Sequence, residues 1–171
     1  MKTEVVLVDD NDQELGTMEK MEAHRQAKLH RAFSVFIFDK EGRMLLQQRA
    51  VDKYHSGGLW TNACCSHPYP GEPVQLAASR RLQEELGFSV PLTPLFSFVY
   101  KAPFDNGLTE YEYDHVFAGT YNGEIVPDPR EVAAVTYKSL EEIETDLALV
   151  PAKYTSWFHI AFPRLAAIRK Q

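Results

Sequence analysis

The chain has 171 residues, of which 44% are hydrophobic, and a formal net charge of −6. This length fits a single domain spanning residues 1–171, and the hydrophobic content is enough for a packed core. The negative charge argues against non-specific nucleic-acid binding, which needs a basic face. An anionic substrate would therefore need local Lys and Arg groups, or bound cations, that reverse the potential inside its site.

Membrane and secretory signals are not expected in this sequence. No apolar run approaches the roughly 20 residues that cross a bilayer, and the first residues lack the long apolar segment of a secretory signal. The two cysteines, Cys64 and Cys65, are adjacent, so they cannot form an ordinary long-range intrachain disulfide. We expect a soluble, cytoplasmic protein with free thiols.

The first half of the chain is rich in strand signals. Strands are expected at residues 4–8, 32–38, 43–49 and 59–63. A Gly-containing turn at residues 39–42 predicts that the second and third of these strands form a hairpin.

A helix is expected to follow, because Ala and Leu recur at three- and four-residue spacings after Pro73. Pro73 suits a first helical position, and Gly87 suits a C-terminal cap.

The second half of the chain adds more strands and two helices. Strands are expected at residues 95–101, 111–119 and 133–137, and helices at residues 140–149 and 156–170. The sequence has no internal repeat or linker. This element order predicts an α/β or α+β sandwich in which helices flank a mixed β-sheet.

Cys65 and His67 are the first candidates for chemistry. In an extended segment they would share one face while Cys64 points to the other, because a strand sends alternate side chains to opposite faces. An isolated cysteine is more often a small buried hydrophobe. The nearby histidine and the Arg/Glu block that follows favour Cys65 as a reactive thiol.

Glu110 and Glu112 repeat the same alternation in a later strand. Two carboxylates held together repel unless a cation or a shared proton relieves them. Taken alone, such a pair is slightly more often a solvated edge face. Together with His24 and His30, which would converge on them from a loop, the pair would form a nitrogen and oxygen shell for Mn²⁺, Zn²⁺ or Mg²⁺.

Arg81 and Glu85 stand four residues apart on the expected helix. An ordinary ion pair, worth about 0.2–0.5 kcal/mol, is the simplest interpretation. Yet Glu84 and Glu85 lie at the helix C-terminus, where the helix dipole disfavours negative charge, so they suggest a bound cation. The basic residues available for a diphosphate are Lys20, Arg49, Lys53 and Arg81, although each alone is most simply a surface charge.

Two aromatic residues have a structural and a functional interpretation. Trp157 is usually a core anchor in such a helix, but its indole face would also stabilise a carbocation by about 2 kcal/mol in a dry pocket. Tyr100 would either pack in its strand or donate a hydrogen bond to a carboxylate.

The segment from Ser66 to Phe88 resembles a Nudix box, the signature of a superfamily of diphosphohydrolases. Aligned on Arg80, the box puts its first glutamate at Glu72 and its final pair at Glu84 and Glu85. This sequence departs from the pattern at Ser66, where the box has glycine, and at Arg81, where it has a metal-binding glutamate. The resemblance implies a Nudix-like sandwich, and Arg81 argues against hydrolysis.

A narrower resemblance is carried by Cys65-x-His67-Pro68, by the segment from Leu29 to Ser34 and by Glu110-x-Glu112. These motifs resemble those of type I isopentenyl diphosphate isomerases, which have the Nudix fold, and the likeness runs from Lys20 to Trp157. The gap between His24 and His30 is one residue shorter than the pattern.

The resemblance implies a role for each matching residue. Cys65 and Glu112 would transfer protons, with Tyr100 beside Glu112, and Trp157 would form a wall of the hydrocarbon pocket. A Mn²⁺ or Zn²⁺ would be held by His24, His30, His67, Glu110 and Glu112. Glu85 would help to hold a Mg²⁺ on the diphosphate, with Lys20, Arg49, Lys53 and Arg81 around the diphosphate oxygens.

The implied reaction is the conversion of isopentenyl diphosphate to dimethylallyl diphosphate, in which Glu112 adds a proton and Cys65 removes another. Two alternatives remain at this stage: a Nudix hydrolase acting on a nucleotide or prenyl diphosphate, and a module that binds diphosphate without turnover. The resemblance implies a small-molecule prenyl diphosphate as the partner, while the net charge argues against nucleic acid and the lack of a long apolar run argues against a membrane. It leaves the oligomeric state open.

Overall fold

The computed structural model describes residues 3–169, which form a nine-stranded sheet and flanking helices. The strands are β1 (Glu4–Val8), β2 (Glu14–Glu19), β3 (His30–Phe38), β4 (Met44–Arg49), β5 (Trp60–Thr61), β6 (Cys64–Ser66), β7 (Thr93–Pro103), β8 (Thr109–Thr120) and β9 (Val132–Lys138). The helices are α1 (Lys20–Arg25), α2 (Val74–Leu86), α3 (Leu140–Leu149) and α4 (Ser156–Arg169), with a short 3-10 turn at Pro151–Lys153. The expected α+β sandwich with a mixed sheet is confirmed.

Strand β3 lies at the centre of the sheet. It runs parallel to β8 along its whole length and antiparallel to β6, while β7 pairs with β8 on the far side. The expected hairpin of β3 and β4 is present only at its tip, where Phe38 pairs with Met44. Beyond that pair the strands separate, because β4 pairs with β9.

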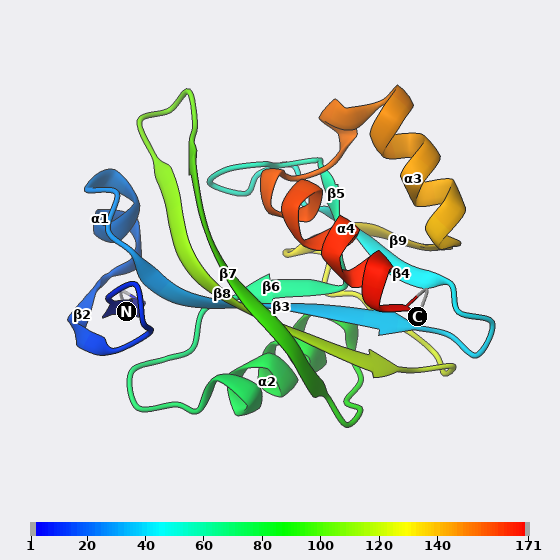
Figure 1. The fold of residues 1–171 in the computed structure, drawn as a ribbon, viewed down its shortest axis with the longest axis horizontal. Helices are drawn as coiled ribbons and strands as arrows, with labels where there is room; N and C mark the ends of the chain where they lie inside the picture. The colour runs from blue at the N-terminus through cyan, green and yellow to red at the C-terminus, as the bar shows by residue number, and fades with distance from the viewer. Residues whose placement is uncertain (1–2, 170–171) are drawn as a thin grey trace.

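Helices cover both faces of the sheet (Figure 1). The alternation along β3 explains the two layers: Phe33, Val35 and Ile37 pack against α2, whereas Phe36 and Phe38 pack against α4. Every one of these five side chains is fully buried. The even-numbered face of β3 therefore looks toward α4, and the site lies on this face.

The central helix α2 ends as the sequence predicts. Gly87 adopts the left-handed conformation with φ of 79°, and its N–H bonds to the Gln83 carbonyl. The helix begins one residue later than expected, because Pro73 occupies the N-cap. The last helix, α4, is also confirmed, although Lys170 lies outside the described residues.

Two parts of the sequence prediction were wrong. The strand expected at residues 59–63 is only the two-residue β5, and a separate strand, β6, begins after Asn62 and Ala63. Asn62 bonds to the carbonyls of Val35 and Cys64, so its amide group replaces the regular ladder there. Strand β2 and helix α1 were not predicted; the acceptor that begins α1 is the Glu19 carboxylate, an uncommon N-cap residue.

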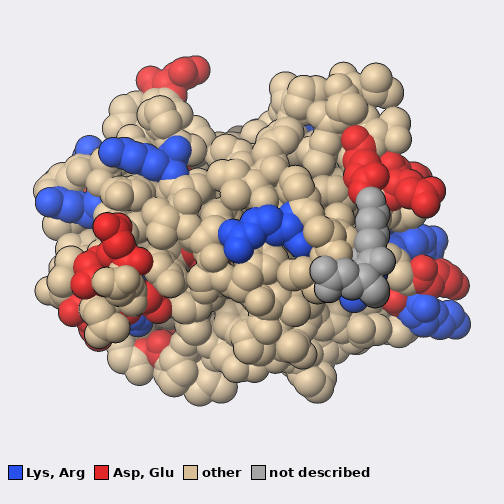
Figure 2. Space-filling view, viewed as in Figure 1, with Lys and Arg blue, Asp and Glu red and all other residues tan. Residues whose placement is uncertain are grey.

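The negative charge is not spread evenly over the face shown in Figure 2. Acidic side chains gather over the β1–β2 hairpin, which carries Asp10 and Glu14, and over α3, which carries Glu141 and Glu142. Most of the surface between these two regions is uncharged on the face shown. Within residues 3–169, no helix is both long and apolar enough to span a membrane.

Phe158 is the central contact of α4 with the sheet. It is fully buried and stacks on Phe36, with ring centroids 6.2 Å apart. Phe158→Ala should lower the free energy of unfolding by about 3–5 kcal/mol, because it leaves a cavity in this layer. Urea denaturation measures the change, with Ile160→Ala as the control, since Ile160 is 41% exposed on the same helix. Equal losses in the two variants would contradict this packing.

Candidate active site

The register of three strands assembles the site. Glu110, Glu112 and Asp114 alternate along β8 and are all buried on the face toward α4. In the neighbouring strands, His30 of β3 and Tyr100 of β7 are the register partners of Glu112. The expectation that Glu110 and Glu112 share a face is confirmed. The alternative of a solvated edge is wrong, because β8 is an interior strand.

Four of the expected ligands converge on a point suited to a divalent metal. His24, His30, His67 and Glu112 each offer one ligand atom within 4.8 Å of the others, and all four are buried. The Nδ1 atoms of His24 and His30 bond to the backbone carbonyls of Lys20 at 2.7 Å and of Lys28 at 2.9 Å. These bonds direct each Nε2 inward, as in metal-bound histidines.

His30 supplies the clearest sign that an ion fits this group. Its Nε2 is buried without a hydrogen bond, although it lies 3.3 Å from a Glu112 oxygen. A buried polar nitrogen without a hydrogen bond is costly, and a metal bond would satisfy it. His24 does not come from a loop, as was expected: it lies on α1, and His30 is the first residue of β3.

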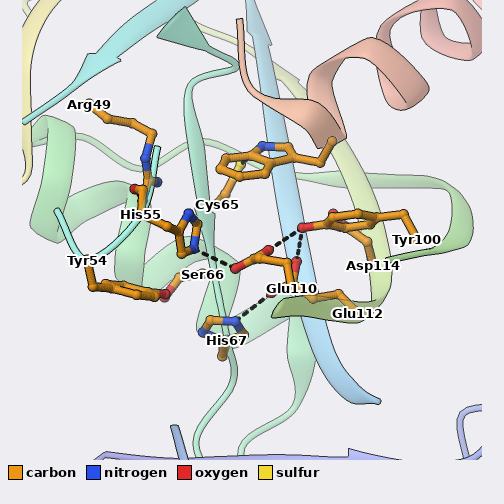
Figure 3. Close-up of a pocket in the computed structure, with 11 residues that line it drawn as sticks. Arg49, Tyr54, His55, Cys65, Ser66, His67, Tyr100, Glu110, Glu112 and Asp114 are labelled. Atoms are coloured by element: carbon orange, nitrogen blue, oxygen red, sulfur yellow. Dashed lines mark hydrogen bonds and ion pairs between the residues drawn. The ribbon is translucent and has the colours of Figure 1, made fainter. Parts of the chain in front are cut away.

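Glu110, the fifth expected ligand, lies next to this group. It forms a second possible metal-binding group with His24 and His55. Its Oε1 lies 3.2 Å from His24 Nε2. The same oxygen lies 2.7 Å from His55 Nε2 (Figure 3). Because the Nδ1 of His24 is already bonded, its single free nitrogen cannot serve two ions. The two groups share His24 and therefore belong to a single metal centre.

The two glutamates have lowered pKa values despite their burial. Burial alone would raise the pKa of Glu110, but hydrogen bonds from His24 and His55 lower it well below its ordinary value. Burial and the charge of Glu110 raise the pKa of Glu112, while the His30 and His67 imidazoles lower it to a net depression. Tyr100 donates its hydroxyl to both carboxylates (Figure 3). This arrangement gives a cation a charged, pre-ordered set of oxygens.

Cys65 faces the cavity that contains these carboxylates. Its thiol donates to Asn62 Oδ1 at 3.2 Å, and the Trp157 indole N–H donates to its sulfur at 3.0 Å. Burial raises the pKa of the Cys65 thiol, and the nearby Asp114 raises it further, so the thiol keeps its proton. Cys64 points the other way and donates to Glu85 Oε2 at 3.1 Å. The expectation that Cys65 and Cys64 point to opposite faces is confirmed.

A second cavity adjoins the first and is rich in basic groups. It is lined by all four expected basic residues, Lys20, Arg49, Lys53 and Arg81, together with Glu85 and Glu131. Arg49, Tyr54, Cys65, Ser66 and His67 line both cavities. Arg49 is 8% exposed and its Nε has no hydrogen-bond partner. The second cavity is therefore suited to an anion placed next to Cys65.

Carboxylates already neutralise part of this basic cavity. Lys53 Nζ bonds to Glu131 at 2.6 Å, and Arg81 pairs with Glu84 at 3.0 Å and Glu85 at 3.1 Å. The ordinary ion pair between Arg81 and Glu85 is thus present. Glu85 is also buried within the cavity wall, as a ligand for a substrate-bound cation would be.

Comparison with known proteins identifies the family. Residues 28–158 match the model of the NUDIX domain. The isopentenyl-diphosphate Delta-isomerase of Pectobacterium atrosepticum is 50% identical over 95% of this chain and 91% of its own length. The protein of the same name from Burkholderia multivorans is 47% identical over 96% of this chain and 93% of its own. The chain belongs to the isopentenyl-diphosphate Delta-isomerase family.

Solved structures show that this isomerase family member has the Nudix fold. A Deinococcus radiodurans protein, DR0079, superposes with a TM-score of 0.78 over 94% of this chain and 98% of its own, at 18% identity. A MutT NUDIX hydrolase from Burkholderia pseudomallei gives a TM-score of 0.63 over 79% of this chain and 96% of its own, at 23% identity. At these identities the likeness establishes the fold alone.

Several residues around the site were not found from the sequence. They are Ser34, Tyr54, His55, Asn62, Asp114 and Glu131. Asp114 could have been found, because it continues the alternation of Glu110 and Glu112 along the same strand. Ser34 could have been found only with the register, which pairs it with Cys65. His55 and Glu131 lie in irregular segments whose positions no sequence periodicity reveals.

Proposed function

We propose that this isomerase family member converts isopentenyl diphosphate to dimethylallyl diphosphate. The observation that carries the proposal is the pair of adjoining cavities. One is lined by basic side chains, and the other contains Cys65, Glu112 and Trp157. The substrate has the same two parts, a diphosphate and a short apolar tail. The names of the relatives and the motifs in the sequence support the same reaction.

The diphosphate would lie in the basic cavity. Lys20, Arg49, Lys53 and Arg81 would surround its oxygens, and Glu85 would hold a Mg²⁺ that also binds the diphosphate. The unpartnered Nε of Arg49 supports this assignment, because a buried guanidinium nitrogen favours an anionic acceptor. Binding energy from this end of the substrate would hold the tail in the reacting position.

The His/Glu group would hold a Mn²⁺ or Zn²⁺ through His24, His30, His67 and Glu112, with Glu110 at its border. A mixed set of imidazoles and carboxylates suits both ions. The bound ion would supply positive charge that fixes the carboxylates and tunes the acidity of Glu112.

Cys65 and Glu112 would carry the two proton transfers. One group adds a proton to the terminal carbon of the alkene, and the other removes a proton from C2. The family resemblance assigns the addition to Glu112 and the removal to Cys65. Burial raises the pKa of the Cys65 thiol, and the His30 and His67 imidazoles lower that of Glu112. Tyr100 contacts both Glu110 and Glu112, so its hydroxyl would help to hold the carboxyl group that gives up the proton.

Protonation of the alkene creates a tertiary carbocation that water would trap. Trp157 is 3% exposed and lines the cavity, so its indole would both exclude water and stabilise the cation. Its N–H on Cys65 would keep the sulfur in place beside the reacting carbon.

Hydrolysis is the second candidate, and Arg81 argues against it. In the Nudix box this position carries a metal-binding glutamate, and here a guanidinium bonds to Glu84 and Glu85. Incubation of the purified protein with isopentenyl diphosphate and Mg²⁺ separates the two reactions. Isomerisation yields acid-labile allylic diphosphate without free phosphate. Release of phosphate or diphosphate before acid treatment would refute the proposal.

Metal removal should abolish activity and lower the melting temperature. The His/Glu group is buried, and removal of the ion would remove the positive charge that all of its imidazoles and carboxylates bind. An ion that binds only the folded state stabilises it by about 2.7 kcal/mol at a hundred times its dissociation constant. We would follow thermal unfolding after chelation and during titration with Mn²⁺ and with Zn²⁺. A chelated protein with full activity and an unchanged melting temperature would contradict the metal site.

A further inference from the structure

His55 is a buried histidine to which the proposed reaction gives no role. It lies in the loop between β4 and β5, and its side chain is 2% exposed. Its Nδ1 lies 3.1 Å from the Ser56 hydroxyl, and its Nε2 lies 2.7 Å from Glu110 Oε1. If the hydroxyl donates to Nδ1, the ring carries its hydrogen on Nε2 and donates it to Glu110.

This bond reaches Glu110 from outside the metal group. His55 is grouped with His24 and Glu110, whereas the four converging ligands are His24, His30, His67 and Glu112. Metal bonds to nitrogen and oxygen are about 2.0–2.2 Å long, so the ligands of one ion must surround a single point. His55 therefore stands behind Glu110 with respect to an ion held by the four, and holds one carboxylate oxygen while Tyr100 holds the other.

The ring of His55 makes a second set of contacts. It stacks on Phe104 with ring centroids 4.7 Å apart and planes at 6°. Its edge meets the Trp157 indole at 5.9 Å and 85°. Both His55 and Trp157 line the cavity that contains Cys65. One imidazole thus touches a carboxylate of the metal centre and the indole of the apolar wall.

The loop is built tightly enough to hold the ring in this place. Arg49 donates to the His55 carbonyl at 3.2 Å, and Ser56 has a φ of 54°, which is unfavourable for a residue other than glycine. At Gly57 a Cβ atom would lie 2.4 Å from the Val51 carbonyl oxygen, so only glycine fits. Strain of this kind persists where the surrounding structure fixes it.

We propose that His55 is a positioning residue that fixes Glu110 at the metal centre through Nε2 and fixes the Trp157 indole through its ring. The ring and the N–H have separate tasks, so they can be removed separately. Only the effect of His55 on turnover rests on the proposed function. The effects on metal binding and on the indole are expected without any substrate.

Two substitutions separate the tasks. His55→Gln keeps an N–H donor for Glu110 and removes the ring, whereas His55→Phe keeps a ring and removes the donor. We would measure the dissociation constant of Mn²⁺ by chelator competition and that of Co²⁺ by its absorption spectrum, without substrate. His55→Phe should weaken binding by about 10–100-fold, as loss of a ligand-orienting bond does. His55→Gln should stay within about threefold of the wild type and keep the Co²⁺ spectrum.

The indole is followed by fluorescence in a Trp60→Phe background, which leaves Trp157 as the single tryptophan of the chain. Quenching by acrylamide should increase in His55→Gln and stay unchanged in His55→Phe. His159→Gln is the control, because the contact described for the His159 ring is to the Pro151 carbonyl, away from the metal group.

Three results would overturn the proposal. Wild-type metal affinity in His55→Phe would show that the bond to Glu110 does not matter. Equal loss of metal in both variants, with a changed Co²⁺ spectrum, would make His55 a ligand and not a positioning residue. Unchanged quenching in His55→Gln would remove the link to Trp157. A wild-type protein that fails to isomerise the substrate would refute the proposed function and leave these measurements valid.

Discussion

Cys65→Ser is expected to reduce turnover of isopentenyl diphosphate by about 10²–10⁴-fold or more while the protein stays folded. A serine hydroxyl is a far weaker acid than the thiol, so it cannot exchange a proton with C2 at a useful rate. The hydroxyl can still bond to Asn62 and Trp157, which now contact the sulfur, so packing should be retained. Turnover is measured from product formation, and folding from the melting temperature.

Cys64→Ser is the matched control, since it makes the same change one residue earlier. Cys64 is fully buried and donates to Glu85, a bond that serine can also make. We expect activity within a few-fold of the wild type. Full activity in Cys65→Ser, or equal loss of activity in the two variants, would contradict the choice of Cys65.

Glu112→Gln should have the second large effect, on both metal affinity and turnover. The amide lacks the charge that faces His30 and His67, whose Nε2 atoms lie 3.3 and 2.7 Å from the carboxylate. It also cannot accept and release a proton as a carboxyl does, so turnover should fall by roughly 10²–10⁴-fold. Metal titration and initial rates measured at saturating metal separate the two losses.

Glu124→Gln supplies the control for this change, because Glu124 is exposed in the segment between β8 and β9. Glu124→Gln should leave metal affinity and turnover unchanged. If Glu112→Gln turned over at the wild-type rate once its metal site was filled, Glu112 would have no part in proton transfer.

The site was predictable where a residue lies on a regular element. Strand alternation put Cys65 and Cys64 on opposite faces and Glu110 and Glu112 on one face, and both expectations hold in the structure. Alternation could not show that β8 is an interior strand, because strand order depends on contacts between distant segments. Because β8 lies between β3 and β7, Glu110 and Glu112 are buried and do not face solvent.

The rest of the site depends on irregular backbone and on the tertiary register. His24 was expected in a loop because α1 is only six residues long and its N-cap is a glutamate. His55 lies in a loop with one non-glycine residue of positive φ, Ser56, and a glycine, Gly57, that no other residue can replace sterically. Neither feature leaves a periodic pattern in the sequence. The position of His55 between the metal centre and Trp157 could therefore be found only from the structure.

The central claim is that two side chains exchange protons with one diphosphate substrate. Proton NMR of isopentenyl diphosphate with the purified protein, Mg²⁺ and Mn²⁺ in D₂O tests it most directly. We predict loss of the vinylidene signal, with deuterium appearing in the new methyl group of dimethylallyl diphosphate and no free phosphate. An unchanged vinylidene signal in the metal-loaded protein, or phosphate released without deuterium incorporation, would contradict the account.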